Sequence, residues 1–348
     1  MNYSVAAVRV NKSKPILSPN NSVFKFNYNP SLFTLPNGKD VLLVRCQAVD
    51  SNGNALPSVL AISEFKTPLK EYHLDYIEMT PICECDIVFS PETERETFGT
   101  EDPRVVYDSN RKEYHMLYSA VQANPMFSRL ALATSKDPSD SSKWVRHGTL
   151  YEENSKSGAA ILINEKKNKY AMVWGDHSLT YTTSEDLLNF KEVQRNWLTT
   201  RSEKFDSFLV ESGPPPIRLS DGNFFFVYNS ARRMENGQIQ YNAGYLVLDK
   251  DNPQTILQRS DIPILSPDLD WEKQGLVPNV VFVEGMKKIK HKNGEDKFLI
   301  AYGAGDSNIG AALVTVSYCG CKKKNISCFG LFNTLKMMWK GRTKSKLI

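Results

Sequence analysis

The stretch DGNFFFVY at residues 221–228 joins a polar turn to a strand-like run of five apolar or aromatic residues. Asp-Gly is a dipeptide typical of tight turns, and aromatic and β-branched residues favour strands. A second strand-like run, YNAGYLVL at residues 241–248, follows after a gap. The turn and its two runs together predict a β-hairpin.

The same hairpin pattern occurs five times along the chain. The first runs lie at residues 41–45, 114–118, 170–174, 224–228 and 298–302, and the second runs at 58–62, 128–134, 178–183, 241–248 and 309–314. The copies begin roughly 55–75 residues apart, which indicates a repeat architecture. Five such units predict an all-β fold, a five-bladed β-propeller, because radial repetition protects the edges of the sheets. The pentapeptide PILSP at 15–19 and 263–267 predicts equivalent turns before two blades.

Composition and charge limit the functional classes. The chain has 348 residues, of which 41% are hydrophobic, and no apolar run approaches the length of a membrane-spanning helix. The net charge of +4 arises in residues 319–348, which hold eight Lys or Arg and no acid, so the remaining body carries −4. Nucleic-acid binding by the body therefore has no support. Because the N-terminus shows no secretory signal, we expect a cytoplasmic protein.

The six cysteines form two Cys-x-Cys pairs and two single residues. Their spacing matches no zinc-binding pattern, and the sequence requires no metal. In a reducing compartment we expect free thiols. The residues are Cys46, Cys83, Cys85, Cys319, Cys321 and Cys328.

We expect the propeller to span residues 1–318 and a basic tail to span 319–348. Apolar residues from Phe329 to Trp339 recur at roughly helical spacing, with Lys and Arg among and after them. Two interpretations stay open: a terminal helix docked on the propeller, or a basic amphipathic helix on an anionic membrane with nearby cysteines as acylation sites. Nothing in the sequence fixes an oligomeric state.

Polar residues adjoin the repeated strands, and in a propeller we expect them to converge on a central funnel. Acids, arginines and aromatic residues around one pocket suit a sugar ligand, because carboxylates supply general acids and bases. The candidates are Asn29, Arg45, Glu101, Asp102, Arg104, Arg129, Asp176, Glu211, Tyr228, Asn229, Glu272 and Asp306.

Several motifs in this set occur in a fixed order: GTEDPR at 99–104, LVESGPP at 209–215, GLVPNVVF at 275–282 and YGAGD at 302–306. With Asn29-Pro30 and Arg45, they resemble glycoside hydrolase family 130, the five-bladed β-mannoside phosphorylases and β-mannosidases. The resemblance extends from residue 15 to residue 314. It implies that Asp102 is the general acid, which passes its proton through a sugar hydroxyl in a single inverting displacement. It also implies that Arg45, Arg104 and Asp306 bind sugar.

The resemblance further bears on what attacks the anomeric carbon. Family phosphorylases tend to carry a lysine where this chain has Leu209, a histidine where it has Asn229, and often an arginine where it has Trp174-Gly175-Asp176. Arg129 remains as a phosphate contact. Loss of these cations beside an added carboxylate disfavours phosphate. We expect Glu211 to be the base that activates water, with Glu272 as the second candidate.

The sequence therefore predicts an inverting hydrolase of β-linked mannosides, β-1,2 links first, with a β-mannoside oligosaccharide as its substrate. The first alternative is a β-mannoside phosphorylase or a mannose 1-phosphate-dependent mannosyltransferase. The second is a carbohydrate-binding propeller without catalysis. We expect no cofactor, and inorganic phosphate as a reactant only in the phosphorylase alternative.

Overall fold

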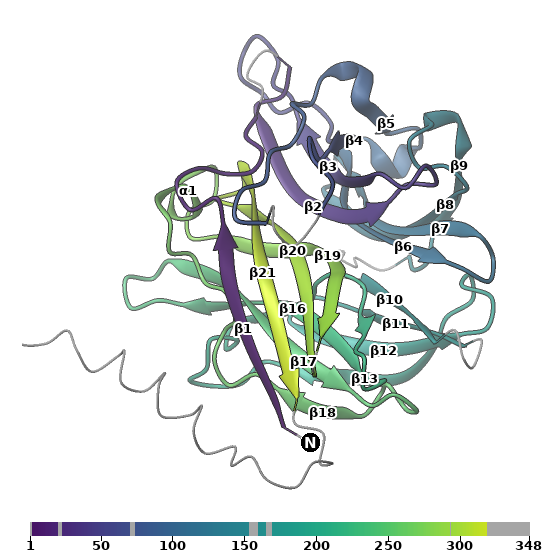
Figure 1. Cartoon of the computed structure of the whole chain (residues 1–348). Coiled ribbons are helices and arrows are strands. Elements are labelled where there is room, and N and C mark those ends of the chain that lie inside the picture. The colour runs from purple at the N-terminus through teal and green to yellow at the C-terminus, as the bar shows by residue number, and fades with distance from the viewer. Residues whose placement is uncertain are drawn as a thin grey trace, which may run out of the picture.

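The repeated hairpins form five antiparallel sheets, which confirms the predicted all-β propeller (Figure 1). The structure is a computed structural model, and it describes residues 2–19, 23–69, 74–152, 159–164, 169–292 and 294–318. The predicted tail, residues 319–348, lies outside the described residues, so both interpretations of it stay predictions. None of the described helices is long and apolar enough to cross a membrane.

The blades follow one another along the chain, and each is built from four main strands. Blade 1 contains β2 (Phe26–Thr34), β3 (Asp40–Gln47), β4 (Val59–Glu64) and β5 (Ile87–Phe89). Blade 2 contains β6 (Gly99–Asp108), β7 (Glu113–Gln122), β8 (Phe127–Ser135) and β9 (Trp144–Thr149). Blade 3 contains β10 (Ala159–Asn164), β11 (Lys169–Trp174), β12 (Ser178–Ser184) and β13 (Lys191–Thr199).

The last two blades complete the ring. Blade 4 contains β14 (Leu209–Ser212), β16 (Phe224–Arg233), β17 (Ile239–Leu248) and β18 (Ile256–Arg259), with β15 (Ile217–Arg218) paired to β16. Blade 5 contains β19 (Val281–Lys292), β20 (Glu295–Ala304), β21 (Asn308–Tyr318) and the N-terminal strand β1 (Tyr3–Val10). The described helical turns are short: η2 (Glu84–Asp86), η3 (Glu94–Glu96), η4 (Ser141–Lys143) and α1 (Asp270–Lys273).

The two ends of the described chain close the ring. Strand β1 (purple in Figure 1) runs antiparallel beside β21 (yellow), from Tyr3 opposite Tyr318 to Val10 opposite Ala311. Because β1 supplies the outer strand of blade 5, backbone hydrogen bonds hold the N-terminal segment to the last blade of the chain. The sequence repeats alone did not predict this closure.

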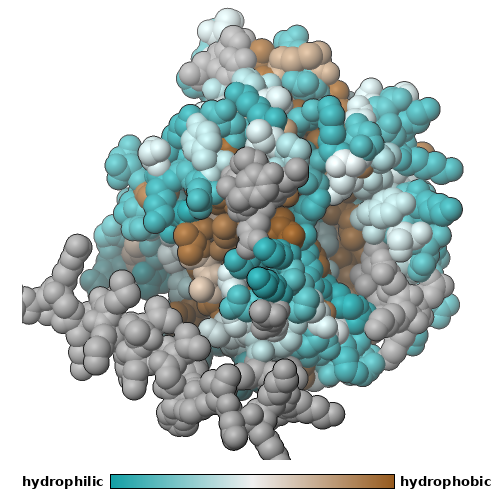
Figure 2. Space-filling view, in the orientation of Figure 1, coloured by the Kyte–Doolittle hydropathy of each residue, from teal (hydrophilic) through white to brown (hydrophobic). Residues whose placement is uncertain are grey.

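Five apolar clusters lie between neighbouring blades and explain why FFFVY shows no alternation of apolar and polar residues. Phe224 and Phe226 pack toward blade 3, whereas Phe225 and Val227 pack toward blade 5. All four side chains are at most 2% exposed. Burial of a large apolar side chain contributes about 1.5–3 kcal/mol, so each middle strand joins two interfaces. The visible outer surface is mostly hydrophilic (Figure 2).

The two PILSP segments occupy equivalent positions, as predicted. Leu17 forms an isolated bridge with Ile309 on β21 before the chain enters blade 1. Leu265 forms the same kind of bridge with Ala243 on β17 before blade 5. Each segment therefore bonds the connection between two blades to the third strand of the first of those two blades.

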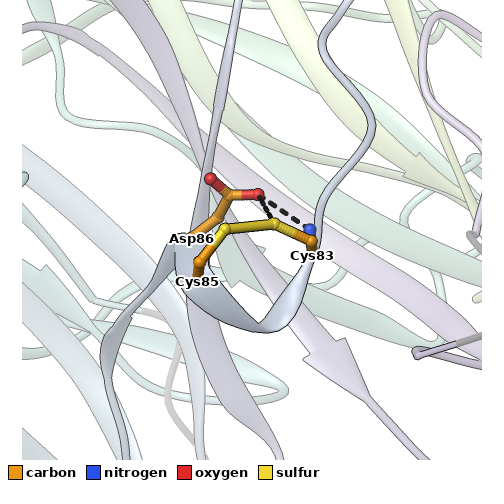
Figure 3. A group of neighbouring side chains, drawn as sticks. All are labelled: Cys83, Cys85 and Asp86. Carbon is orange, nitrogen blue, oxygen red and sulfur yellow. Dashed lines mark hydrogen bonds between the residues drawn. A yellow bond between two sulfur atoms is a disulfide. The ribbon is translucent and has the colours of Figure 1, made fainter.

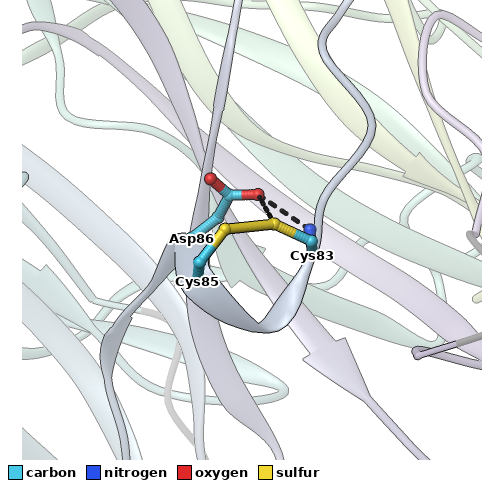
Figure 4. The surroundings of a disulfide bond; sticks show 3 residues. All are labelled: Cys83, Cys85 and Asp86. Atoms are coloured by element: carbon cyan, nitrogen blue, oxygen red, sulfur yellow. Dashed lines mark hydrogen bonds between the residues drawn. A yellow bond between two sulfur atoms is a disulfide. The ribbon is translucent and has the colours of Figure 1, made fainter.

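The cysteine prediction is wrong for one pair. Cys83 and Cys85 form a disulfide across the turn η2, and the carboxylate of Asp86 accepts a hydrogen bond of 2.7 Å from the backbone N–H of Cys83 (Figures 3 and 4). The tight turn brings the two sulfur atoms together, which spacing alone did not show. These three residues are close enough to share a metal ion, but the disulfide occupies both sulfur atoms. Cys46 is free and buried.

Candidate active site

A pocket of about 450 Å³ is lined by residues of blades 1, 2, 4 and 5. The first strands of neighbouring blades contact one another, so side chains at their ends meet at one place. The volume lies within the range of small-molecule sites. Six of the predicted residues line it: Asn29, Arg45, Glu101, Asp102, Glu211 and Asp306.

Asp102 occupies a strained position on β6. Its φ of 51° is in the left-handed region, which few residues other than glycine adopt. The register between β6 and β7 shifts between Glu101 and Arg104, so Asp102 and Pro103 form an irregularity in the strand. Strained backbone of this kind concentrates at functional sites, because the surrounding structure must hold it. Here Asp102 lines the pocket, and the residue is 6% exposed.

Two donors from blade 1 meet the same oxygen of Asp102. Nδ2 of Asn29 donates a hydrogen bond of 3.0 Å to Oδ1, and Nη1 of Arg45 donates one of 3.2 Å to it. Nη2 of Arg45 donates a bond of 2.7 Å to Oε1 of Glu101. Burial alone would lower the pKa of Arg45, but the carboxylates of Glu101 and Asp102 raise it above its ordinary value. Arg45 therefore stays charged and donates hydrogen bonds to both Glu101 and Asp102.

Close backbone contact fixes Asn29 in this place. A Cβ atom on Gly303 of β20 would lie 3.0 Å from the backbone nitrogen of Asn29 and would also collide with its side-chain oxygen. Gly303 is therefore needed for blade 5 to approach blade 1. Asp306, just beyond the end of β20, also lines the pocket and also has a positive φ, of 47°.

Glu211 lies on the short strand β14 of blade 4. Glu211 is 2% exposed and lines the pocket. Nη2 of Arg104 lies 3.7 Å from its Oε1. Arg104 itself is buried and does not line the pocket, so the structure does not place it as a direct sugar ligand. Its guanidinium supports the strand that carries Glu211.

Three other predicted residues do not line the pocket. The hydroxyl of Tyr228 donates to Asp206 at 2.8 Å inside blade 4. Asn229 bonds the backbone of Val283 in both directions, donating to its carbonyl at 2.9 Å and accepting from its N–H at 2.7 Å. Asn229 therefore ties blade 4 to blade 5. Arg129 lies over the ring of Phe127 at 4.1 Å, and only its neighbour Ser128 lines the pocket.

Asp176 and Glu272 are also outside the pocket lining. Asp176 forms a backbone bridge to Glu211, but its carboxylate lies 3.0 Å from Nδ1 of His177. Glu272 is fully buried and pairs with Arg9 at 2.7 Å, and it accepts a hydrogen bond of 2.8 Å from Tyr302. Glu272 therefore stabilises the closure of the ring, and its buried position outside the pocket lining does not suit the role of the base.

The structure adds residues that the sequence interpretation missed. Phe98, Ser119, Tyr241 and Phe282 line the pocket. Phe282 belongs to the quoted motif GLVPNVVF, so the motif did carry the signal for it. Phe98 directly precedes β6, whereas Ser119 and Tyr241 lie inside β7 and β17, where strand pairing decides the direction of a side chain. A further acid that the sequence interpretation missed is Glu284, which is fully buried and lies 2.9 Å from Arg104.

Comparison with known proteins identifies the family. The sequence model of glycoside hydrolase family 130, described as β-1,4-mannooligosaccharide phosphorylase, matches residues 74–319. The chain is 35% identical over 230 residues to a 1,2-β-oligomannan phosphorylase of Thermoanaerobacter sp. (strain X514), an alignment that covers 65% of this chain and 72% of the relative. The chain belongs to glycoside hydrolase family 130.

Solved structures of similar fold agree with this assignment. One from Parabacteroides distasonis superposes with a TM-score of 0.71 at 26% identity, covering 89% of this chain and 96% of the other. Another comes from work describing glycoside hydrolases among the family's mannoside phosphorylases that target β-1,2-mannosidic linkages in Candida mannan. It has a TM-score of 0.70 at 25% identity and covers 88% and 93% of the two chains.

Proposed function

We propose that this chain cleaves β-linked mannosides, β-1,2 linkages first, with inversion at the anomeric carbon. Relatives of the chain are named as phosphorylases of 1,2-β-oligomannan and β-1,2-mannobiose, which supports the substrate class. The observation that carries the proposal is that two carboxyl groups from different blades, those of Asp102 and Glu211, line the same pocket. An inverting enzyme needs an acid on one face of the sugar ring and an attacking group on the other.

We assign Asp102 the role of the acid. Oδ1 of Asp102 accepts hydrogen bonds from both Asn29 and Arg45. The family resemblance routes the proton of Asp102 through a sugar hydroxyl to the glycosidic oxygen. Asn29 and Arg45 then hold the carboxyl group in one orientation while the bond breaks.

We propose that water, activated by Glu211, is the attacking group. Four carboxylates line the pocket, and the described residues add one cation to its lining, Arg45, which is already paired with Glu101 and Asp102. Two like unit charges 4 Å apart repel by about 4 kcal/mol at an effective dielectric constant of 20, so a phosphate dianion is disfavoured beside Glu211. Leu209, where the resemblance places a lysine in phosphorylases, presents an apolar side chain to the pocket.

Phosphorolysis is the second candidate, and the sequence comparisons favour it. The curated relatives at 32–35% identity are phosphorylases. The charge of the pocket thus favours water as the attacking group, whereas the relatives favour phosphate, on the same substrate. The same fold, acid and sugar site serve both reactions.

Incubation of the protein with β-1,2-mannobiose, with and without inorganic phosphate, tests the proposal. Hydrolysis gives mannose alone at a rate that phosphate does not raise. Formation of mannose 1-phosphate, or a strict need for phosphate, overturns water as the attacking group and supports phosphorolysis. Absence of turnover in both mixtures, with other β-mannosides also inert, overturns the proposed cleavage.

A further inference from the structure

Glu284 is a buried acid that neither proposed chemical step uses. It lies on β19 where the register with β20 shifts between Val283 and Gly285, and none of its surface is exposed. Oε1 lies 2.9 Å from Nη2 of Arg104, yet neither oxygen accepts a hydrogen bond from the described part of the chain. A buried acid with one charged partner is costly to keep, so its surroundings require an explanation.

Arg104 connects Glu284 to both proposed catalytic carboxyls. Its Nη1 donates to the backbone carbonyl of Asp102 at 3.1 Å, within the strained turn. Its Nη2 and Nε donate to the carbonyls of Ser212 and Gly213 at 2.9 and 3.1 Å, directly after Glu211. One guanidinium therefore links the turn of the acid in blade 2 to the strand of the base in blade 4. Glu284 approaches that guanidinium from blade 5.

The local charges do not balance if every carboxyl group is ionised. The charged groups that face Glu284 are Arg104 and Asp102 from β6, Glu211 from β14 and Arg45 from β3. Arg45 is shared between Glu101 and Asp102, and Arg104 between Glu211 and Glu284. Two arginines thus face four carboxyls, so the cluster favours retaining a proton. Burial raises the pKa of the Glu284 carboxyl well above its ordinary value; Arg104 opposes this increase, and Asp102 and Glu211 add to it.

We propose that Glu284 is a positioning residue, which acts through Arg104 on the turn of Asp102 and shares the proton of the acid cluster. The inference rests on the proposed role of Asp102 as an acid. Interaction between titrating groups is reciprocal, so ionised Glu284 makes Asp102 hold its proton to higher pH. A permanently neutral residue at position 284 lacks this effect. With a neutral residue at position 284, Asp102 therefore gives up its proton at a lower pH.

The pH dependence of kcat/KM for Glu284→Gln tests this inference. The glutamine keeps the size of the side chain and an oxygen that can face Arg104. We expect the alkaline limb of the profile to move down by roughly half a pH unit, which is about a threefold loss of rate on that limb. Glu96→Gln is the matched control: Glu96 is 1% exposed and lies 3.5 Å from its own arginine, Arg146, outside this pocket. Its alkaline limb should coincide with that of the unmodified protein.

An alkaline limb of Glu284→Gln that coincides with that of the unmodified protein overturns the proposal, and leaves Glu284 a structural residue. The assay uses β-1,2-mannobiose with and without phosphate, because either attacking group requires the same acid. If neither mixture gives turnover, the proposed function fails separately. In that case, titration of the Asp102 carboxyl by ¹³C NMR in both proteins decides: a lower titration pH in Glu284→Gln supports the coupling, and an equal one rejects it.

Discussion

The side chain of Asp102 has an orientation that its backbone imposes, because a left-handed φ and the following proline leave it few alternatives. Asp102→Asn keeps the shape of the side chain but removes the transferable proton. We expect kcat on β-1,2-mannobiose to fall by about 10²–10⁴-fold, the usual contribution of general acid catalysis, with the thermal midpoint little changed. Steady-state kinetics and thermal unfolding measure both effects.

The leaving group provides the control for this variant. An aryl β-mannoside with an acidic phenol needs little proton assistance, so Asp102→Asn should lose much less activity on it. An equal loss on both substrates would remove Asp102 from proton transfer. It would assign Asp102 to binding, together with Asn29 and Arg45.

At the same scale, the sequence predicted which residues lie near the site better than it predicted which of their side chains face the pocket. Asn29, Glu101, Asp102 and Glu211 all lie on first strands of blades and line the pocket. Tyr228 and Asn229 lie on a middle strand and turn into interfaces between strands or blades. A polar residue beside an apolar strand can either face a ligand or satisfy a backbone group, and hydropathy does not distinguish the two.

At the scale of elements, the sequence predicted the middle strands of the blades but did not predict the full first strand β6 or the closing strand β1. The runs at 114–118 and 224–228 fall inside β7 and β16, which are buried on both faces. The first strand β6 contains Glu101, Asp102, Pro103 and Arg104, so the pattern that marks a strand is broken there by the site itself. The closing strand β1 pairs with β21 from the far end of the chain, and local pattern carries no sign of such a pairing.

The ion pair between Arg9 and Glu272 supports this closing strand. Arg9 on β1 donates through Nε and Nη2 to the two oxygens of Glu272, each at 2.7 Å, and Glu272 is fully buried. Arg9→Met would leave the acid buried without its partner, and we expect the free energy of unfolding in urea to fall by about 3–5 kcal/mol. The double variant Arg9→Met/Glu272→Gln should recover part of the loss, because no charge is then buried alone. A double variant as unstable as the sum of the two single variants would show that the two residues act independently.

At the scale of the whole molecule, the five blades depend on one another because each apolar cluster is shared between two of them. Inner strands add polar links across the same boundaries: Ser31 of β2 accepts from the N–H of Val105 on β6 at 3.0 Å, and Ser212 of β14 donates to the carbonyl of Val173 on β11 at 2.7 Å. Loss of stability in one blade therefore lowers the stability of the ring. The pocket exists only while blades 1, 2, 4 and 5 stay in place.

A buried histidine makes this stability depend on pH. His115 on β7 is 2% exposed, and burial lowers its pKa to about 4, although the nearby carboxylate of Asp108 acts in the opposite direction. Between pH 6.5 and about 4 the unfolded chain binds a proton at this residue that the folded chain does not. The contribution of His115 to the free energy of unfolding is therefore fully present above pH 6.5. It decreases as the pH falls through that window, by about 3 kcal/mol in all.

Urea unfolding of the parent protein and of His115→Gln, each at pH 7 and pH 4.5, measures this contribution. Both proteins lose stability from their carboxylates over this range, so the informative quantity is the difference between their two losses. We expect the parent to lose about 2 kcal/mol more than His115→Gln, because the glutamine does not titrate. Equal losses in the two proteins would mean that His115 keeps an ordinary proton affinity in the folded state. The acid sensitivity of the ring would then arise from its carboxylates alone.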